Sequence, residues 1–86
     1  MSFRITKMRR FHESAFKHGI SAADIEHVLR QPMRLIVRED GSRLYLGPGR
    51  NAELLEVITV LQADRSEVAI HAMKIRPGYA NLLPRE

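Results

Sequence analysis

EVAIHAMKIRPGY, residues 67–79, is the stretch on which the prediction of the fold depends. In its first half two sets of side chains alternate. Val68, Ile70 and Ala72 form one set, and Ala69, His71 and Met73 form the other. Alternation of this kind is typical of a β-strand, because successive side chains point to opposite faces of a sheet. Pro77 and Gly78 end the pattern. The stretch therefore predicts a final strand that leads into a basic and aromatic segment.

Three further strands are predicted upstream of this one. They cover residues 33–39, 44–46 and 54–62, and the last of them, LLEVITVLQ, is the longest and most apolar. Asp40-Gly41 is a strong hairpin-turn signal between the first two, and the segments 47–51 and 64–66 carry the glycine, proline and polar residues of turns. Four consecutive strands with short connections predict an antiparallel meander.

The N-terminal third has helical spacing. Residues 10–17 predict a short helix, and Gly19 lies where a helix commonly ends. Ser21 is predicted to cap a second helix, with an apolar stripe on one side and Pro32 beyond its end. Helices followed by a run of strands indicate the α+β class. The predicted fold is therefore two N-terminal helices packed on a four-stranded antiparallel sheet, in a single domain over residues 1–86.

Composition restricts the class of protein. The chain has 86 residues and no cysteine, which rules out disulfides and thiolate metal sites. No run reaches the roughly 20 apolar residues of a membrane span, and the N-terminus has no apolar core of signal-peptide length, so a cytoplasmic protein is expected. The net charge is +4, and eleven of the 14 basic residues are arginine. Arginine matches phosphate geometry well, which favours nucleic acid or an acidic protein as partner.

The closing strand carries the candidate catalytic residues. Metal-independent RNA cleavage needs a base, an acid and a cation that stabilises the negative phosphorane. His71 is the best acid or base candidate, because imidazole exchanges protons near neutral pH; a half-buried structural histidine is the alternative. Arg76 is predicted to clamp phosphate, although an exposed strand-end arginine is an equal alternative. Tyr79 is predicted to stack on a base or donate a proton, with a tyrosine that covers the edge of the core as the equal alternative. Glu56 is predicted to serve as a base or to orient Arg50 or His71; a plain surface glutamate on a half-exposed sheet is the alternative.

Four more residues are predicted to bind substrate: Arg50, Lys74, Lys17 and His18. Arg50 follows a glycine-rich loop that can present backbone N–H groups to an anion, yet the loop lacks the spacing of a P-loop. Lys74 starts on the face opposite His71, so only a bulge or the strand end would redirect it. No metal site is expected, because His12 and His18 are not spaced to meet on one helix. No cofactor is expected either.

Several short motifs resemble a known family. They are HGI, SAADIEHVLRQP, GPGRN, LLEVITV and VAIHAMKIRPGY, and together they span most of the chain. The chain resembles small bacterial proteins of the BrnT-like group, relatives of the RelE-type toxins of toxin–antitoxin pairs. The resemblance implies a compact RelE/BrnT-like fold, metal-independent RNA cleavage and a cognate antitoxin, and it places Arg76 and Tyr79 at the family's site. BrnT-like chains often have a more basic C-terminal tail, whereas this tail has only Arg85.

The leading hypothesis is therefore an mRNA interferase-like endoribonuclease, the toxin of a bacterial type II toxin–antitoxin pair. Its partners would be RNA and a cognate antitoxin, in a homo-oligomer or a toxin–antitoxin hetero-oligomer. The alternative is a non-catalytic protein-interaction module of the same fold. A simple nucleic-acid-binding protein is a third hypothesis, weakened by the absence of an aromatic-rich RNA motif.

Overall fold

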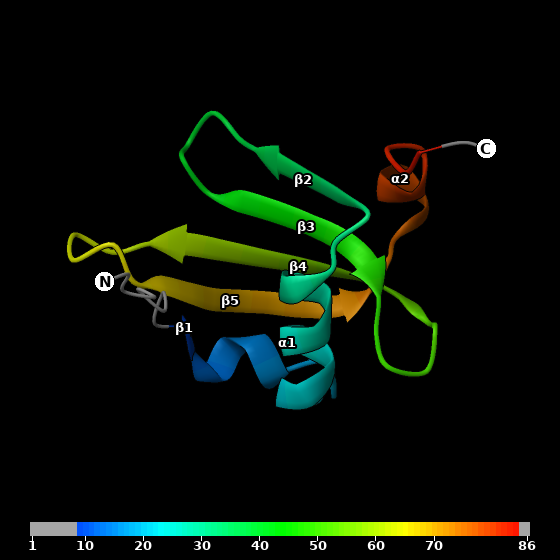
Figure 1. The fold of residues 1–86 in the computed structure, drawn as a ribbon, viewed down its shortest axis with the longest axis horizontal. Helices are drawn as coiled ribbons and strands as arrows, with labels where there is room; N and C mark the ends of the chain where they lie inside the picture. The colour runs from blue at the N-terminus through cyan, green and yellow to red at the C-terminus, as the bar shows by residue number, and fades with distance from the viewer. Residues whose placement is uncertain (1–8, 85–86) are drawn as a thin grey trace, which may run out of the picture.

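Five strands form one sheet in the computed structural model, which describes residues 9–84. The strands are β1 (Arg9–Phe11), β2 (Arg34–Val37), β3 (Arg43–Pro48), β4 (Leu54–Leu61) and β5 (Glu67–Lys74). Their order across the sheet is β1-β5-β4-β3-β2 (Figure 1). β1 runs parallel to β5, and every other neighbouring pair is antiparallel. The sheet is therefore mixed.

The predicted pair of helices on a four-stranded antiparallel sheet is wrong. The described chain has one helix of several turns, α1 (Ala22–Arg30), a 3₁₀ turn η1 (Glu13–Phe16) and a single turn α2 (Pro77–Ala80). The segment expected to be the first helix instead contributes the fifth strand, β1, and then η1. The α+β class remains, with a different number of helices and strands.

Pairing with β5 explains why residues 9–16 do not form a helix. His12 has an extended backbone (φ −75°, ψ 148°), and its amide donates to the Ala69 carbonyl at 2.9 Å. The Ser14 hydroxyl donates to the Ile70 carbonyl at 2.6 Å. These bonds satisfy backbone groups on the outer edge of β5 that would otherwise lack partners. A tertiary contact thus outweighs the weak helical spacing of Phe11 and Ala15.

The start of α1 agrees with the prediction. The Ser21 hydroxyl accepts a hydrogen bond from the Asp24 amide at 3.2 Å, which makes Ser21 the N-cap. The helix ends at Arg30, two residues before Pro32. Its buried stripe is Ile25, Val28 and Leu29.

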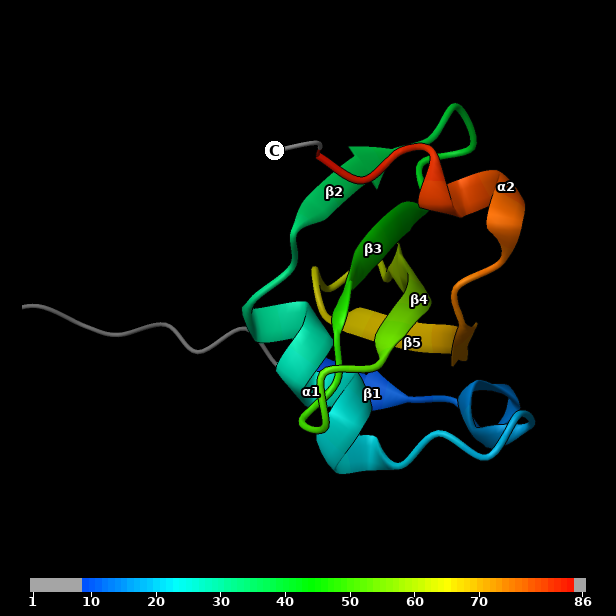
Figure 2. The ribbon, with the colours of Figure 1, turned by 90° about the vertical axis from the view of Figure 1, so that its right-hand side faces the viewer.

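Each face of the sheet has its own apolar layer. Figure 2 shows α1 and α2 on opposite sides of the strands. On the α1 side, the helix stripe packs with Ala15 from η1 and with sheet residues Tyr45, Leu55, Val57, Ala69 and Ala72. On the α2 side, Leu44, Leu46 and Ile58 are covered by the C-terminal segment, through Ile75, Tyr79, Leu82 and Leu83. The chain after β5 therefore returns over the second face.

A bulge in β5 places Ala69 and His71 on opposite faces of the sheet. Ile58 of β4 is opposite His71 and Thr59 is opposite Ala69, so Ile70 has no partner of its own. The extra residue shifts the alternation by one position. Ala69 and Ala72 consequently both join the α1 layer, whereas the sequence placed Ala69 on the face of His71. His71 lies on the α2 face.

Residues 1–8 of the N-terminus, which is predicted to lack a signal peptide, and Arg85 of the tail lie outside the described residues. Within residues 9–84, no helix is long and apolar enough to cross a membrane.

Candidate functional site

Glu56 is the centre of the candidate site. It lies in β4, where Leu46 and Met73 are its neighbours on β3 and β5. The alternation of β4 directs it to the α2 face together with Ile58, and its side chain is 0 % exposed. A carboxylate buried in an apolar sheet is costly unless its oxygens are paired. The identity of its partners is therefore the main question about this site.

Two residues supply those partners. The Arg76 guanidinium donates to Oε2 from Nη2 at 2.7 Å and from Nε at 3.0 Å. The Arg76 backbone amide donates to Oε1 at 3.0 Å, because Arg76 is extended (φ −84°, ψ 151°) at the N-cap of α2. His71 Nε2 lies 2.9 Å from Oε2. Charge-assisted bonds of this kind are short and strong, so both oxygens of Glu56 are held.

These contacts set the charge of the site. Burial raises the pKa of the Glu56 carboxyl, but the hydrogen bonds from the Arg76 guanidinium, from His71 and from the Arg76 amide outweigh it and hold that pKa below its ordinary value of 4.5. The same hydrogen bond and charge raise the pKa of the Arg76 guanidinium. At neutral pH the pair is therefore a carboxylate and a guanidinium.

The charge of Glu56 determines which nitrogen of His71 is available. An ionised carboxylate only accepts hydrogen bonds, so Nε2 carries the proton and donates to Glu56. In the neutral ring Nδ1 then keeps its lone pair. The His71 side chain is 23 % exposed. The arrangement resembles the carboxylate–imidazole pairs that hold one tautomer in place.

His18 and Tyr79 complete the cluster. The rings of His18 and His71 meet edge to face, with centroids 5.6 Å apart. Gly19 follows in the left-handed region (φ 82°) and donates to the Phe16 carbonyl at 3.1 Å, which ends η1 and brings His18 to β5. On the other side, the Arg76 guanidinium carbon lies 5.1 Å from the centroid of the Tyr79 ring.

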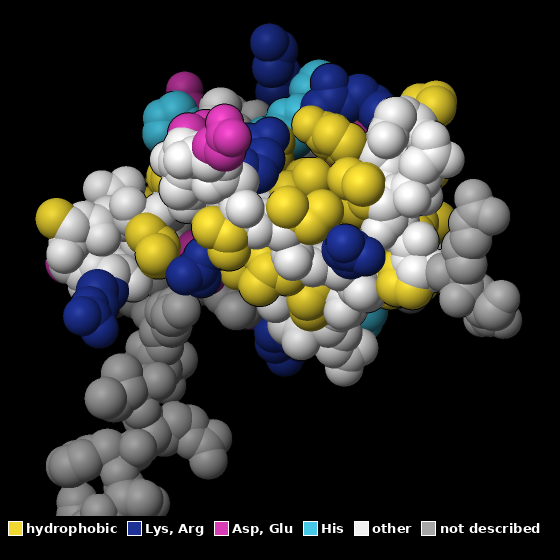
Figure 3. Space-filling model, turned by 90° about the horizontal axis from the view of Figure 1, so that it is seen from above, with side chains coloured by type: hydrophobic (Ala, Val, Ile, Leu, Met, Phe, Trp, Pro, Cys, Tyr) yellow, Lys and Arg dark blue, Asp and Glu magenta, His cyan; other side chains and the backbone are white. Residues whose placement is uncertain are grey.

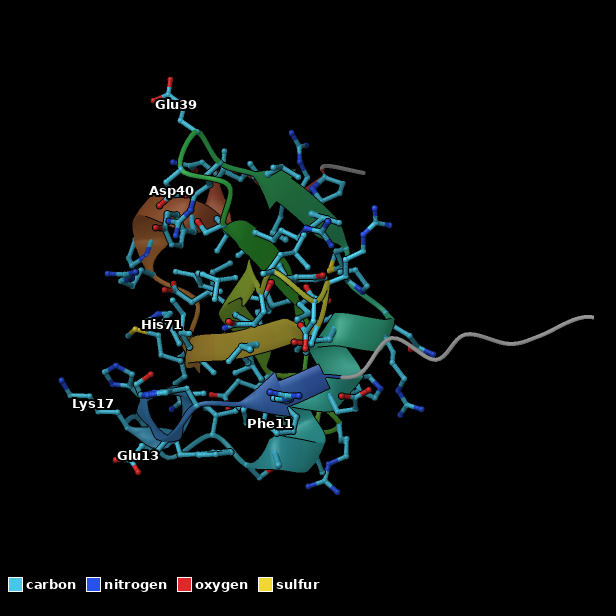
Figure 4. The ribbon with its side chains drawn as sticks, turned by 90° about the vertical axis from the view of Figure 1, so that its left-hand side faces the viewer. Phe11, Glu13, Lys17, Glu39, Asp40 and His71 are labelled. Atoms are coloured by element: carbon cyan, nitrogen blue, oxygen red, sulfur yellow. The ribbon has the colours of Figure 1, made fainter. Side chains whose placement is uncertain are left out.

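The structure groups five of the eight predicted site residues. His71, Glu56, Arg76, Tyr79 and His18 form the cluster. Figure 4 shows Lys17, the residue after η1, reaching into solvent on the same side of the molecule as His71. Lys17 is exposed and lies next to His18 in the chain. It is therefore at the margin of the cluster.

Arg50 and Lys74 are not part of the cluster, contrary to the prediction. The Arg50 side chain and amide both bind Asp24 of α1, at 2.8 and 3.0 Å, and they hold the pKa of that carboxyl below its ordinary value. Lys74 pairs with Glu53 at 3.2 Å. Both contacts are on the α1 side of the sheet, because Lys74 shares a face with Leu55, its partner on β4. Neither cation is directed towards His71.

The role predicted for Glu56 also changes. A base must contact the proton that it removes, and the Glu56 carboxylate is buried and occupied by Arg76 and His71. Its second predicted role, orienting His71, fits these contacts. The alternative of a surface glutamate is wrong, because the side chain is 0 % exposed.

A second buried carboxylate, Glu67, lies on the α1 face and was not predicted from the sequence. Its Oε2 accepts from the Tyr45 hydroxyl and from Thr59 Oγ1, the latter at 2.7 Å. Arg43 Nη1 lies 4.0 Å away. Burial, followed by the hydrogen bond to Glu67, raises the pKa of Tyr45. A charged residue at a strand end is usually solvated, so only the tertiary structure reveals this network.

Comparison with known proteins adds no relative: no family model, no curated protein and no solved structure matches this chain.

Proposed function

We propose that this protein is a metal-independent endoribonuclease, the toxin of a bacterial toxin–antitoxin pair. The observation that carries the proposal is the cluster of His71, His18 and Arg76 around the buried Glu56 carboxylate. It brings two imidazoles and a guanidinium together at the surface. These are the groups that phosphodiester cleavage needs in the absence of a metal. The resemblance to BrnT-like toxins and the excess of arginine support the same function.

The proposed reaction is attack of the ribose 2′-oxygen on the adjacent phosphorus. His71 Nδ1 takes the 2′-hydroxyl proton while Glu56 holds Nε2–H. The bond from phosphorus to the 5′-oxygen breaks, and protonated His18 gives its proton to that oxygen. The products are a 2′,3′-cyclic phosphate and a 5′-hydroxyl.

Arg76 and Glu56 have distinct parts in this reaction. The side-chain contacts with Glu56 use Nε and Nη2 of Arg76, so Nη1 is the nitrogen that we assign to a phosphoryl oxygen. The Arg76 side chain is 51 % exposed, which allows that contact. Glu56 is a positioning residue, because it holds the base and the cation without contacting substrate. The ring of Tyr79 makes a cation–π contact with the Arg76 guanidinium and helps to hold it in position.

The test is RNA cleavage in EDTA, with free RNA and with ribosome-bound mRNA. His71→Gln keeps a donor for Glu56 but cannot take a proton, and His18→Gln removes the acid. Each is expected to lower the cleavage rate by about 100-fold or more, the usual contribution of a general acid or base. His12→Asn is the matched control, because His12 is exposed, its Nδ1 bonds Ser14, and asparagine can keep that bond. Its rate is expected within about twofold of wild type, as for a residue outside the acid–base pair.

Two results would overturn the proposal, and a third would contradict its mechanism. Wild-type protein that cuts neither substrate would leave the interaction module as the function. Cleavage that survives in both glutamine variants would place the chemistry elsewhere, or in a contaminant. Products with a 3′-hydroxyl instead of a cyclic phosphate would also contradict the mechanism.

A further inference from the structure

The strand at the edge of the sheet, β2, has an open side. It is the last strand of the sheet, and its described neighbour is β3 alone. Figure 1 shows it along the top of the molecule, next to α2. Edge strands expose a row of backbone donors and acceptors, so folded proteins usually protect them. The protection of β2 therefore decides whether this edge can bind another chain.

The register shows which backbone groups point outwards. The Arg38 amide donates to the Ser42 carbonyl at 2.8 Å, and Val37 is opposite Arg43. Hydrogen-bonded and non-hydrogen-bonded pairs alternate in an antiparallel ladder. The backbone groups of Ile36, like those of Arg38, therefore face β3. The N–H and C=O groups of Leu35 and Val37 point away from the sheet, where an added strand would bind them.

The side chains of this edge are apolar and uncovered. Met33, Leu35 and Val37 are 46, 46 and 65 % exposed. Leu35 is opposite Tyr45, which is only 4 % exposed beneath the α1 layer. Figure 3 looks down on the side that carries β2 and shows hydrophobic side chains grouped there, with basic side chains among them. β2 has no internal proline or lysine, two of the usual protections of an edge.

Charge indicates what would bind there. Arg34 begins β2 and is exposed, and no carboxylate of residues 9–84 forms an ion pair with it. At the other end, Glu39 projects from the hairpin (Figure 4), whereas the Asp40 carboxylate accepts hydrogen bonds from the Ser42 amide and hydroxyl. The edge is thus basic at Arg34. Past its end, Arg38 offsets the charge of Asp40, so Glu39 carries the outward negative charge. A complementary strand has an acidic end beside Arg34 and a basic end beside the hairpin.

A second copy of this chain fits the edge poorly. Each copy has a net charge of +4, so two copies repel each other at low salt. β2 has four residues, whereas stable interfaces use roughly 20–30 residues from each partner. Self-pairing centred on Ile36 would also set Arg34 against Arg38. An extended segment of a different protein avoids the repulsion, because it can carry acidic side chains and continue past β2.

We propose that β2 is a docking strand for an extended segment of another protein, which adds a sixth strand to the sheet. The segment has apolar side chains at alternate positions, next to Met33, Leu35 and Val37, and acidic residues beside Arg34. Backbone hydrogen bonds supply affinity in this mode of binding, and the alternate side chains supply specificity. The proposal does not rest on RNA cleavage, because the interface lies on the edge of the sheet and not in the His71 cluster.

Two synthetic peptides test the proposal, acetyl-KTVTVTEE-amide for antiparallel addition and its reversed sequence for parallel addition. Binding to the full chain is followed by NMR amide shifts without RNA. One of the two is expected to bind, with the largest shifts at Leu35 and Val37. Arg34→Glu is expected to weaken binding about tenfold, the size of one lost ion pair with a full charge reversal. Arg65→Glu, an exposed arginine in the β4–β5 turn, is the matched control and is expected to bind like wild type.

A double variant, Leu35→Lys with Val37→Lys, is expected to abolish binding. Both positions are exposed, so the variant should keep its melting temperature. Failure of both peptides to bind, or equal binding by wild type and the double variant, would overturn the proposal. Sedimentation supplies a separate check: a wild-type dimer that the double variant dissociates would assign the edge to a second copy and would overturn it too. If the wild-type protein binds a peptide but does not cut RNA, only the proposed nuclease function is refuted, and the docking strand stands.

Discussion

The central role of Glu56 predicts a specific loss of stability in Glu56→Gln. Glutamine keeps the shape of the side chain and one oxygen acceptor, but it removes the negative charge that binds Arg76 and His71. A net hydrogen bond to a charged group contributes about 1.5–3 kcal/mol, and breaking a buried ion pair costs about 3–5 kcal/mol. Arg76 is half exposed, so water recovers part of its charge. We therefore expect a loss of about 2 kcal/mol at pH 7, towards the lower end of these ranges.

Chemical and thermal unfolding measure this loss. For a domain of 60–100 residues, about 1 kcal/mol corresponds to roughly 4–8 °C in melting temperature, so Glu56→Gln should melt about 8–16 °C below wild type. Glu53→Gln is the matched control, because Glu53 is 40 % exposed and pairs with Lys74 at the surface. Its unfolding free energy should change by about 0.5 kcal/mol or less.

The pH dependence gives a second signature. The folded pKa of Glu56 lies below its ordinary value of 4.5. A lowered pKa means that the unfolded chain takes up the proton first, so the stabilisation is present above pH 4.5 and is lost as the pH falls through the folded pKa. The lowered pKa values of Asp24, Asp40 and Asp64 act in the same direction. The difference between wild type and Glu56→Gln isolates the part due to Glu56.

The reasoning would be refuted by a Glu56→Gln variant as stable as Glu53→Gln at pH 7. Equal stability would mean that Arg76 and His71 gain as much from water as from the carboxylate. Acid-unfolding curves of wild type and Glu56→Gln that stay parallel below pH 4.5 would contradict the lowered pKa.

Two further predictions concern the scaffold. Ser21→Ala removes the oxygen that accepts from the Asp24 amide and should lower the unfolding free energy by about 1 kcal/mol; an unchanged urea midpoint would show that Ser21 is not an effective cap. Gly47→Ala places a Cβ 3.2–3.4 Å from the backbone that precedes β2 and should cost about 1–3 kcal/mol by overpacking. Gly78→Ala meets nothing within 4 Å and is its control, so equal melting temperatures for the two alanine variants would contradict the close approach.

Local sequence pattern predicts four strands of the sheet and the part of the site that lies on β5 and its tail. Alternation located the strands from β2 to β5, and Asp40-Gly41 marked the hairpin, where Gly41 has φ 87° and donates to the Arg38 carbonyl at 2.9 Å. The grouping of His71, Arg76 and Tyr79 follows from their closeness along one strand and its tail. Such features depend on neighbours in sequence, which a pattern records directly.

The remaining features depend on contacts between distant segments. β1 forms because the edge of β5 would otherwise be unpaired. No local pattern in residues 9–11 predicts that they pair with β5. The bulge at Ile70 moves Ala69 to the α1 face, and its position depends on how β5 fits β4. Arg50 was predicted to bind an anion of the substrate, but its side chain binds Asp24 of α1 instead.

Glu56 shows the division most clearly. The amino-acid sequence alone determined that Glu56 would be the single acidic side chain inside an apolar strand, on the same face as Ile58. Only the tertiary structure decided that this carboxylate would be buried, because Arg76 returns over the sheet from the turn after β5 and brings both a guanidinium and an amide to it. A charge can leave water only where partners converge on it, and convergence is a property of the folded chain.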